Sequence, residues 1–277
     1  MPTRLSDVEI DTYRRDGYHS PLRVFSPAEA AELRASLEAA ESRAGGPLQG
    51  KWRVKTHLLF TWADRIVHHP AILDAVEDLV GPDILCWTTN FFIKEPSSPG
   101  FVSWHQDATY WGLDPEEVVT AWVALSPSTP ESGCMCVIPG SHTESHIPHV
   151  DTFHKDNLLT RGQEIAVPVD ESRAVDIVLA PGEMSLHDIK LVHGSAPNAS
   201  RDRRIGLAIR YIPTRVKQTQ QQDSAVLVRG TDRYGHFVLE PRPKADLDDA
   251  ALAAHAQAVD RKFKVFYRGT DKTGFRA

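Results

Sequence analysis

The chain changes character near residue 83. Before that position it carries helix start and stop signals, and after it short β-branched or aromatic runs alternate with clusters of Pro, Gly, Ser and Asp. DILCWTTNFFIKEP, starting at Asp83, is the first of these runs, and RRIGLAIRYIPT, starting at Arg203, is the last. A series of helices followed by about seven or eight strands favours a jelly roll with helices packed on one sheet. It disfavours alternating βαβ units.

Cap residues predict where the helices lie. Ser6 and Ser26 are candidate N-caps, each at the start of a helical pattern that glycine ends. Proline occupies the first position of the second helix, where its missing N–H is tolerated. A third helix is predicted over about 70–80, and the tail over about 247–267 returns to a helical pattern.

The 277 residues are enough for one large domain or two small ones, and no linker interrupts them. We therefore expect one domain over residues 1–277. It divides into a helical part at about 1–82, a jelly-roll core at about 83–230 and a C-terminal extension with a helix at about 231–277.

Composition places the chain among soluble globular proteins, because hydrophobic residues make up 41% and charged residues 25%. A formal net charge of -6 argues against a generic nucleic-acid surface, which needs clustered basic residues. No apolar run approaches the roughly 20 residues that cross a bilayer, and the N-terminus lacks the apolar region of a secretory signal. With only 3 cysteines, we expect a cytoplasmic protein that binds neither nucleic acid nor membrane. Its oligomeric state stays open.

The last apolar run shows the clearest strand alternation. Because successive side chains of a strand point to opposite faces, one face carries Ile205, Leu207, Ile209 and Tyr211. The other face carries Arg204, Gly206, Ala208 and Arg210. The apolar face suits packing under helices, and the second face, with arginine beside small residues, suits a cavity wall with room for a small anion.

The segment SWHQDATYW, from Ser103 to Trp111, places His105 and Asp107 on one side of a strand or strand end. An imidazole nitrogen and a carboxylate oxygen bind divalent transition metals at about 2.0 to 2.2 Å, so the pair supplies two adjacent ligands and needs a third. His193 is the best candidate, because it ends a predicted strand just before a Gly-Ser turn and the arginine-bearing strand. Two histidines and one carboxylate on one octahedral face are typical of non-haem Fe(II) oxygenases.

The other histidines near these residues are interpreted without a metal. Four of them, in SHTESHIPHVDTFH, are assigned to a solvated loop, because a proline interrupts any continuous helix that could hold a zinc pair: His142, His146, His149 and His154. His187 lies an even number of positions from His193 and is predicted to pack in the core or to support a ligand.

Three segments together resemble the phytanoyl-CoA dioxygenase family, whose members are Fe(II) and 2-oxoglutarate dependent oxygenases. They are WHQDATYWGLDP, TAWVALSPSTPESGCMCVIPGSH and HGSAPNASRDRRIGLAIRYIP. The resemblance spans roughly Asp83 to Thr214, and the ordered set of H-x-D, IPGSH and HGS with a downstream arginine is specific. It implies a fold that is mainly β with flanking helices, the double-stranded β-helix, which is a cupin-like variant of the jelly roll.

The resemblance implies that His105, Asp107 and His193 hold Fe(II). It also implies that Arg204, eleven positions after His193, binds the distal carboxylate of 2-oxoglutarate, with O2 as the other cosubstrate. Arginine suits this role because its planar guanidinium can donate two parallel hydrogen bonds to a carboxylate.

Further cosubstrate contacts follow from the same resemblance. Ser195 matches a residue that supports the carboxylate, and Trp122 matches an aromatic residue that lines the cosubstrate pocket. A lysine contributes in some relatives, and both Lys55 and Lys94 stay open as its equivalent.

The expected reaction is hydroxylation of an unactivated C–H bond in a small metabolite or natural-product scaffold, with release of succinate and CO2. Asp107 disfavours halogenation, because halogenases of the superfamily carry a small residue at that position. Desaturation, epimerisation and cyclisation stay open. A cupin-like hydrolase or isomerase without redox chemistry also fits the three ligands, and a ligand-binding jelly roll with a vestigial site is a third class.

Three residues are predicted to contact the substrate. Tyr110 and Trp111 directly follow the proposed ligands, and Arg210 shares the strand face of Arg204. Arg210 either anchors an acidic group of the substrate or forms an ion pair at the rim of the barrel.

Overall fold

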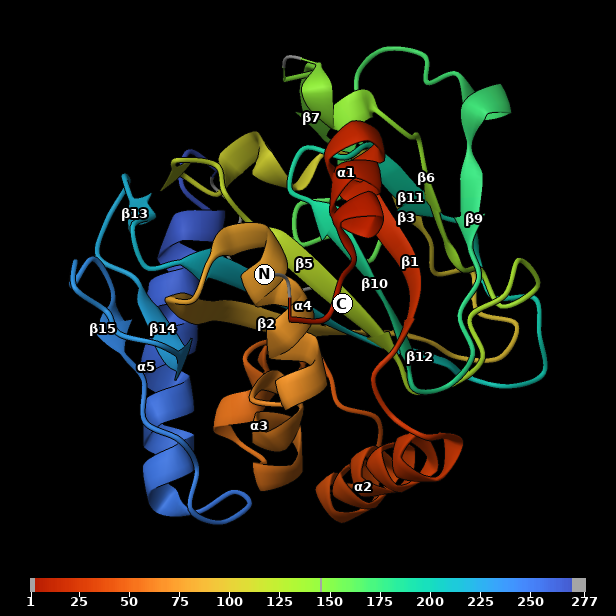
Figure 1. Ribbon diagram of the computed structural model, residues 1–277. Coiled ribbons are helices and arrows are strands. Elements are labelled where there is room, and N and C mark those ends of the chain that lie inside the picture. The colour runs from red at the N-terminus through yellow and green to blue at the C-terminus, as the bar shows by residue number, and fades with distance from the viewer. Residues whose placement is uncertain (1–2, 145, 271–277) are drawn as a thin grey trace.

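The computed structural model describes residues 3–144 and 146–270 (Figure 1). The α-helices of this part are α1 (Asp7–Asp16), α2 (Pro27–Ala44), α3 (Thr61–Val67), α4 (Pro70–Val80) and α5 (Asp249–Phe266). Short 3-10 helices lie at η1 (Gly50–Arg53), η2 (Thr56–Leu58), η3 (Asp107–Tyr110), η4 (Ser141–Thr143) and η5 (Glu171–Arg173). None of these helices is both long and apolar enough to span a membrane.

The predicted helix boundaries are confirmed where caps define them. Ser6 and Ser26 each accept a hydrogen bond from the backbone N–H three residues later, and the glutamate at that position bonds back to the serine N–H. This reciprocal pair satisfies N–H groups that lack an intrahelical partner. The helix α3 was not predicted, because its N-cap, Phe60, makes no side-chain cap that a sequence pattern could reveal.

The larger of two main sheets has seven strands in the order β1-β10-β5-β12-β2-β14-β15. Its strands are β1 (Tyr18–Arg23), β2 (Ile84–Lys94), β5 (Val119–Ala124), β10 (Glu183–Asp188), β12 (Arg204–Pro213), β14 (Ser224–Arg229) and β15 (Val238–Leu239). All neighbours pair antiparallel except β14 and β15. The strand β1 was not predicted, and it lies within the part at about 1–82 that was expected to be helical.

The smaller sheet has the order β3-β11-β6-β9 and faces β5 and β12 of the larger sheet through a shared apolar cluster. Its strands are β3 (Val102–His105), β6 (Met135–Val137), β9 (Val175–Ile177) and β11 (His193–Ser195). Two-stranded pairs join β4 (Leu113–Asp114) to β13 (Lys217–Gln218), and β7 (His149–Asp151) to β8 (Gln163–Ile165). This arrangement is the double-stranded β-helix that the sequence predicts, and solved structures with the same fold support it.

The two faces of β12 lie in the environments that their alternation predicts. Ile205, Leu207 and Ile209 join the apolar cluster that the N-terminal helices form with the large sheet. Arg204 and Arg210, on the opposite face, line a cavity between the sheets. The helices therefore bury one side of the large sheet and leave its other side for a site.

The helix α5 packs beside β14 and β15, at the edge of the large sheet opposite β1 (Figure 1). Lys262 of α5 is fully buried and its Nζ donates to Asp223 Oδ2 at 2.8 Å. The same Nζ lies 3.2 Å from the centroid of the Trp87 ring, and Trp87 Nε1 also donates to Asp223. This buried ion pair fixes the C-terminal helix to the barrel.

The single-domain organisation over 1–277 and the cytoplasmic location stay predictions.

Candidate metal and cosubstrate site

Strand pairing brings together the three residues that the sequence analysis put forward as metal ligands. His105 and His193 are paired residues of β3 and β11, and Asp107 opens η3 just after β3 ends. His105 Nε2 lies 3.4 Å from Asp107 Oδ1. One candidate ligand atom of each residue lies within 4.8 Å of the others, and all three side chains are buried.

One detail of the prediction was wrong. The sequence predicts His193 at the end of a strand that begins near residue 183, but β10 stops at Asp188. The chain then turns, and His193 is the first residue of β11 in the other sheet. In the sequence, β10, the turn and the start of β11 form one continuous apolar run, because Ile189, Leu191 and Val192 in the connection are buried.

In both imidazoles of the cluster, Nδ1 lies at hydrogen-bond distance from backbone carbonyl oxygens. His105 Nδ1 lies 2.9 Å from Ser103 O and 3.0 Å from His193 O, and His193 Nδ1 lies 2.9 Å from Leu191 O. A carbonyl oxygen only accepts hydrogen bonds, so each Nδ1 carries the proton and each Nε2 keeps a lone pair. In this tautomer, Nε2 of the neutral ring is free to bind a metal ion.

The charges in the cluster also fit a divalent cation. Burial opposes ionisation of Asp107, but Arg210 and the two histidines outweigh it and hold the pKa of the carboxyl well below its usual range. Burial lowers the pKa of His193 well below its usual value, so this imidazole is neutral at physiological pH. Asp107 Oδ2 is buried and has no hydrogen-bond partner within the part of the chain that the structure describes. A carboxylate beside two imidazoles is the donor set expected for Fe(II).

A cavity with an empty volume of about 400 Å³ opens beside the two histidines. Its lining includes all the residues predicted to bind 2-oxoglutarate: Trp122, Ser195 and Arg204. Arg204 is 2% exposed, and no carboxylate of the described residues lies within ion-pair distance of it. Burial lowers the pKa of Arg204 to about 10, which leaves the guanidinium charged at neutral pH. A buried cation without a counter-ion is unstable, so this end of the cavity fits an anionic ligand.

Gly206 gives Trp122 its position in the cavity wall. A Cβ atom at residue 206 would lie 1.8 Å from Trp122 Cζ2, so only glycine leaves space for the indole. The Arg204 guanidinium carbon lies 5.2 Å from the centroid of this ring, within the range of a cation–π contact. Trp122 thus holds Arg204 from the side while the guanidinium faces the cavity.

Lys94 lies at the Arg204 end of the cavity, since the two residues are paired across β2 and β12. Its Nζ donates to Ser195 Oγ at 2.6 Å, to Gly133 O at 3.2 Å and to Ala196 O. Burial, reinforced by Arg204, lowers the pKa of Lys94 to about 6. Lys94 therefore holds the hydroxyl of Ser195, a residue that lines this end of the cavity.

Lys55 lies elsewhere. Its Nζ is fully buried, forms an ion pair with Glu240 and donates to Ser224 O at 2.9 Å. The sequence left open which of the two lysines matches the lysine of the relatives. Position alone favours Lys94.

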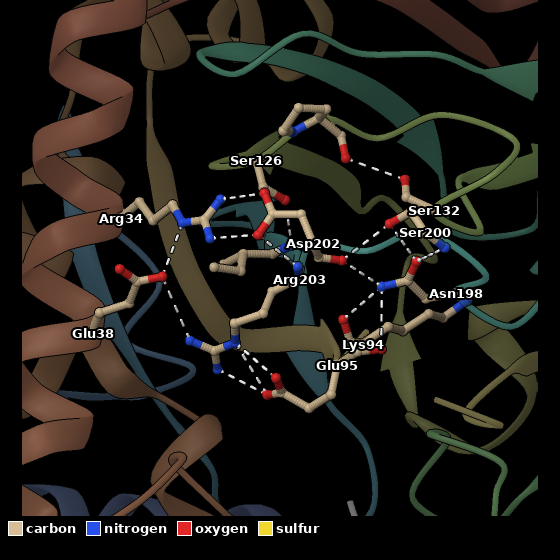
Figure 2. Close-up of polar contacts among 12 residues, drawn as sticks. Arg34, Glu38, Lys94, Glu95, Ser126, Ser132, Asn198, Ser200, Asp202 and Arg203 are labelled. Carbon is tan, nitrogen blue, oxygen red and sulfur yellow. Dashed lines mark hydrogen bonds and ion pairs between the residues drawn. The ribbon is translucent and has the colours of Figure 1, made fainter. Parts of the chain in front are cut away.

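The loop between Ser195 and Arg204 is fixed by polar contacts to α2 and β2 (Figure 2). Asn198 Nδ2 donates to Lys94 O at 3.0 Å and to Asp202 O at 2.8 Å. Arg203 points away from the cavity and pairs with Glu41 and Glu95. Because Arg203 is held on the outer side, its neighbour Arg204 points to the other side, toward the cavity.

Residues predicted to contact the substrate line a second cavity with an empty volume of about 450 Å³. They are Tyr110, Trp111 and Arg210, and Asp107 lines the same cavity. Arg210 Nη2 lies 3.8 Å from Asp107 Oδ2, which favours the ion-pair interpretation of Arg210 over the anion anchor. The two cavities share Phe92 and Arg210 in their walls.

His149 supports the proposed ligands, although the sequence assigned it to a solvated loop. The backbone N–H of Gln106, between His105 and Asp107, donates to His149 Nε2 at 3.0 Å. His149 Nδ1 lies 2.6 Å from Ile147 O, which fixes the tautomer, and Ile147 N donates to Gln106 Oε1 at 2.9 Å. The start of β7 thus holds the residue between two candidate ligands from both sides. No local pattern signals such a contact with a backbone N–H.

His187 lies beside the cluster, as predicted. Its ring centroid is 4.9 Å from that of His193, and its side chain lines the first cavity. Its Nδ1 has no hydrogen-bond partner in residues 3–144 and 146–270. Burial lowers the pKa of His187 to about 4, so the ring is neutral.

The chain is similar to known proteins both in sequence and in fold. The family described as phytanoyl-CoA dioxygenase matches residues 13–206. The solved structure of a non-heme monooxygenase, ThoJ in its apo form, is 42% identical, with a TM-score of 0.84, over 94% of this chain and 97% of that chain. The structure of CytC3 with Fe(II) and alpha-ketoglutarate is 25% identical, with a TM-score of 0.68, over 89% of this chain and 97% of that chain.

A curated relative is a probable alpha-ketoglutarate-dependent hypophosphite dioxygenase of Stutzerimonas stutzeri. It is 29% identical over 56% of this chain and 54% of the relative. The chain spans about half the length of the first curated relatives that it matches, 54% and 43%.

Proposed function

Because the chain belongs to the phytanoyl-CoA dioxygenase family of Fe(II) and 2-oxoglutarate dependent oxygenases, we propose that it hydroxylates an unactivated C–H bond of a small organic molecule. The products besides the hydroxylated substrate are succinate and CO2. The observation that carries this proposal is the buried cluster of His105, Asp107 and His193, whose candidate ligand atoms lie within 4.8 Å of one another.

These three residues would hold Fe(II), each through the atom that the hydrogen bonds leave free. The bound iron supplies the activation of O2, coupled to oxidative decarboxylation of 2-oxoglutarate. Asp107 contributes the single negative charge of the ligand set. It also occupies the position that a halide needs, which is why we propose oxygen transfer and not halogenation.

The cosubstrate would lie in the cavity that Arg204 closes. The Arg204 guanidinium receives the distal carboxylate of 2-oxoglutarate, and Ser195 adds a hydroxyl to the same end. Lys94 positions this hydroxyl by donating to Ser195 Oγ at 2.6 Å. Trp122 excludes water from one side of the cavity.

The substrate would lie in the second cavity, next to Asp107. Tyr110 and Trp111 provide apolar walls there. Arg210 Nη2 lies 3.8 Å from Asp107 Oδ2 and balances the charge of this carboxylate. The two cavities share a wall, so the reacting C–H bond can approach the metal while 2-oxoglutarate occupies the first cavity.

The test is turnover of a panel of small molecules with Fe(II), 2-oxoglutarate and O2. Succinate formation that depends on the substrate, with a mass gain of one oxygen atom in the product, supports hydroxylation. A loss of two hydrogens would indicate desaturation or cyclisation, and an unchanged mass with altered retention would indicate epimerisation. Substrate conversion without succinate would contradict the proposal and favour a non-redox hydrolase or isomerase, in which Arg204 has no evident role.

A further inference from the structure

The second cavity has a lining whose chemistry selects among substrates. Asp107 and Arg210 are the charged residues of this lining, and they face each other at 3.8 Å. Arg161, which lies 5.3 Å from the centroid of the Tyr110 ring, is already paired with Asp151. The opposite charges of Asp107 and Arg210 balance each other, so a charged ligand group would meet a wall without net charge, which compensates little of its desolvation.

The same wall carries buried polar atoms without partners. Thr88 is 3% exposed and Gln163 is 2% exposed, and neither Thr88 Oγ1 nor Gln163 Oε1 has a hydrogen-bond partner among the described residues. Gln163 Nε2 lies 2.8 Å from the Tyr110 hydroxyl. Rotation of this amide by half a turn exchanges its oxygen and nitrogen, so Gln163 offers one free polar atom in either orientation. Buried polar atoms of this kind normally have a partner, and the cavity is where a ligand can provide it.

Aromatic rings form another part of the wall. Phe266, at the end of α5, stacks on Trp111 with centroids 6.4 Å apart and meets the edge of Tyr110 at 5.7 Å. All three rings line the cavity. The flat apolar surfaces of these rings favour a planar, apolar ligand portion packed against them.

We infer that the second cavity recognises substrates by a neutral hydrogen-bonding group, an amide or a hydroxyl, attached to a planar ring. The neutral group bonds to Thr88 and Gln163, and the ring packs against Tyr110, Trp111 and Phe266. This inference rests on the proposed function, because it assigns the cavity beside Asp107 to the substrate.

Calorimetric titration with three probes of similar size tests the inference: benzamide, benzoate and benzylamine. The protein is loaded with Fe(II) and 2-oxoglutarate without O2. We expect benzamide to bind at least about tenfold more tightly than either charged probe. Thr88→Val and Gln163→Met should each weaken benzamide binding by about fivefold to tenfold, because each removes one hydrogen bond while nearly preserving volume.

Thr214→Val is the matched control, since Thr214 is buried and lines neither cavity. It should bind benzamide like the wild type, and thermal unfolding shows that each variant is folded. Equal or tighter binding of benzoate or benzylamine, unchanged benzamide affinity in both cavity variants, or no binding of any probe would overturn the inference.

The same samples separate this inference from the proposed function. The visible absorption band of an Fe(II) and 2-oxoglutarate complex reports on the first cavity and the ligand cluster. If that band forms but probe binding gives one of the contradicting results above, the inference alone is wrong. If the band does not form, the proposed function is wrong.

Discussion

His105 and His193 are paired residues of neighbouring antiparallel strands, and their ring centroids lie 4.1 Å apart. Hydrogen bonds from the two Nδ1 atoms to backbone carbonyls add a second constraint on the rings. The separation of the two imidazoles is therefore set by the sheet and not by a loop. A site built this way is ordered before a metal binds, and substitutions within it should affect metal and cosubstrate binding more than folding.

Arg204→Met should raise the 2-oxoglutarate concentration needed for half-maximal succinate formation. Charge-assisted hydrogen bonds contribute roughly 1.5 to 3 kcal/mol, which corresponds to about tenfold to a hundredfold. Arg203→Met is the matched control, because Arg203 pairs with Glu41 and Glu95 outside the cavity. Equal 2-oxoglutarate requirements in Arg204→Met and the wild type would contradict the assignment of this residue.

His149→Ala should weaken Fe(II) binding by about tenfold, the lower end of what residues that orient metal ligands contribute. The substitution removes the acceptor of the Gln106 N–H and loosens the residue between His105 and Asp107. His149→Gln can restore an acceptor near the same place and should recover most of the affinity. Titration of Fe(II) at saturating 2-oxoglutarate measures both, and equal affinities for the alanine and glutamine variants would count against this positioning role.

Stability should fall in acid partly because of Glu240. Burial opposes its charge, but Lys55 and His57 outweigh burial and lower the pKa of the carboxyl to about 2, from an ordinary value of 4.5. A carboxyl whose pKa is lowered by folding stabilises the protein fully above pH 4.5. This contribution is lost as the pH falls toward 2.

Glu240→Gln isolates this contribution. The variant should be less stable than the wild type at pH 7, since it leaves Lys55 buried without its counter-ion, and the difference should shrink between pH 4.5 and pH 2. Urea unfolding at several pH values measures the two free energies of unfolding. A difference that is constant over this pH range would show that Glu240 does not titrate as described.

Local patterns were enough to predict the parts of the fold that they control directly. The alternation on β12 indicated both of its faces, and the serine caps of α1 and α2 marked their starts. The strand β1 was missed because it is an edge strand with a proline and mostly half-buried residues, so it shows no clear alternation. Strands of two or three residues, such as β4 and β13, are too short for any periodicity.

In the candidate site, too, local patterns predict some residues and miss others. The spacing of His105 and Asp107 is a local feature, and the structure places both beside His193. The roles of His149 and Gln163 depend on contacts between distant segments, with Gln106 and with Tyr110, that no local pattern records. Local patterns therefore predict the groups that we propose for metal and cosubstrate, and they do not reveal residues such as His149 and Gln163 that act through distant contacts.

The most direct test is titration of the apo-protein with Fe(II) in the presence of 2-oxoglutarate and the absence of O2. We predict a weak visible charge-transfer band that saturates at about one Fe(II) per chain in the wild type, as expected for a single three-ligand site with open positions. In Asp107→Ala the band should be lost or require at least about tenfold more Fe(II), because the only anionic ligand is gone. Absence of the band in the wild type, or an unchanged titration in Asp107→Ala, would contradict the account.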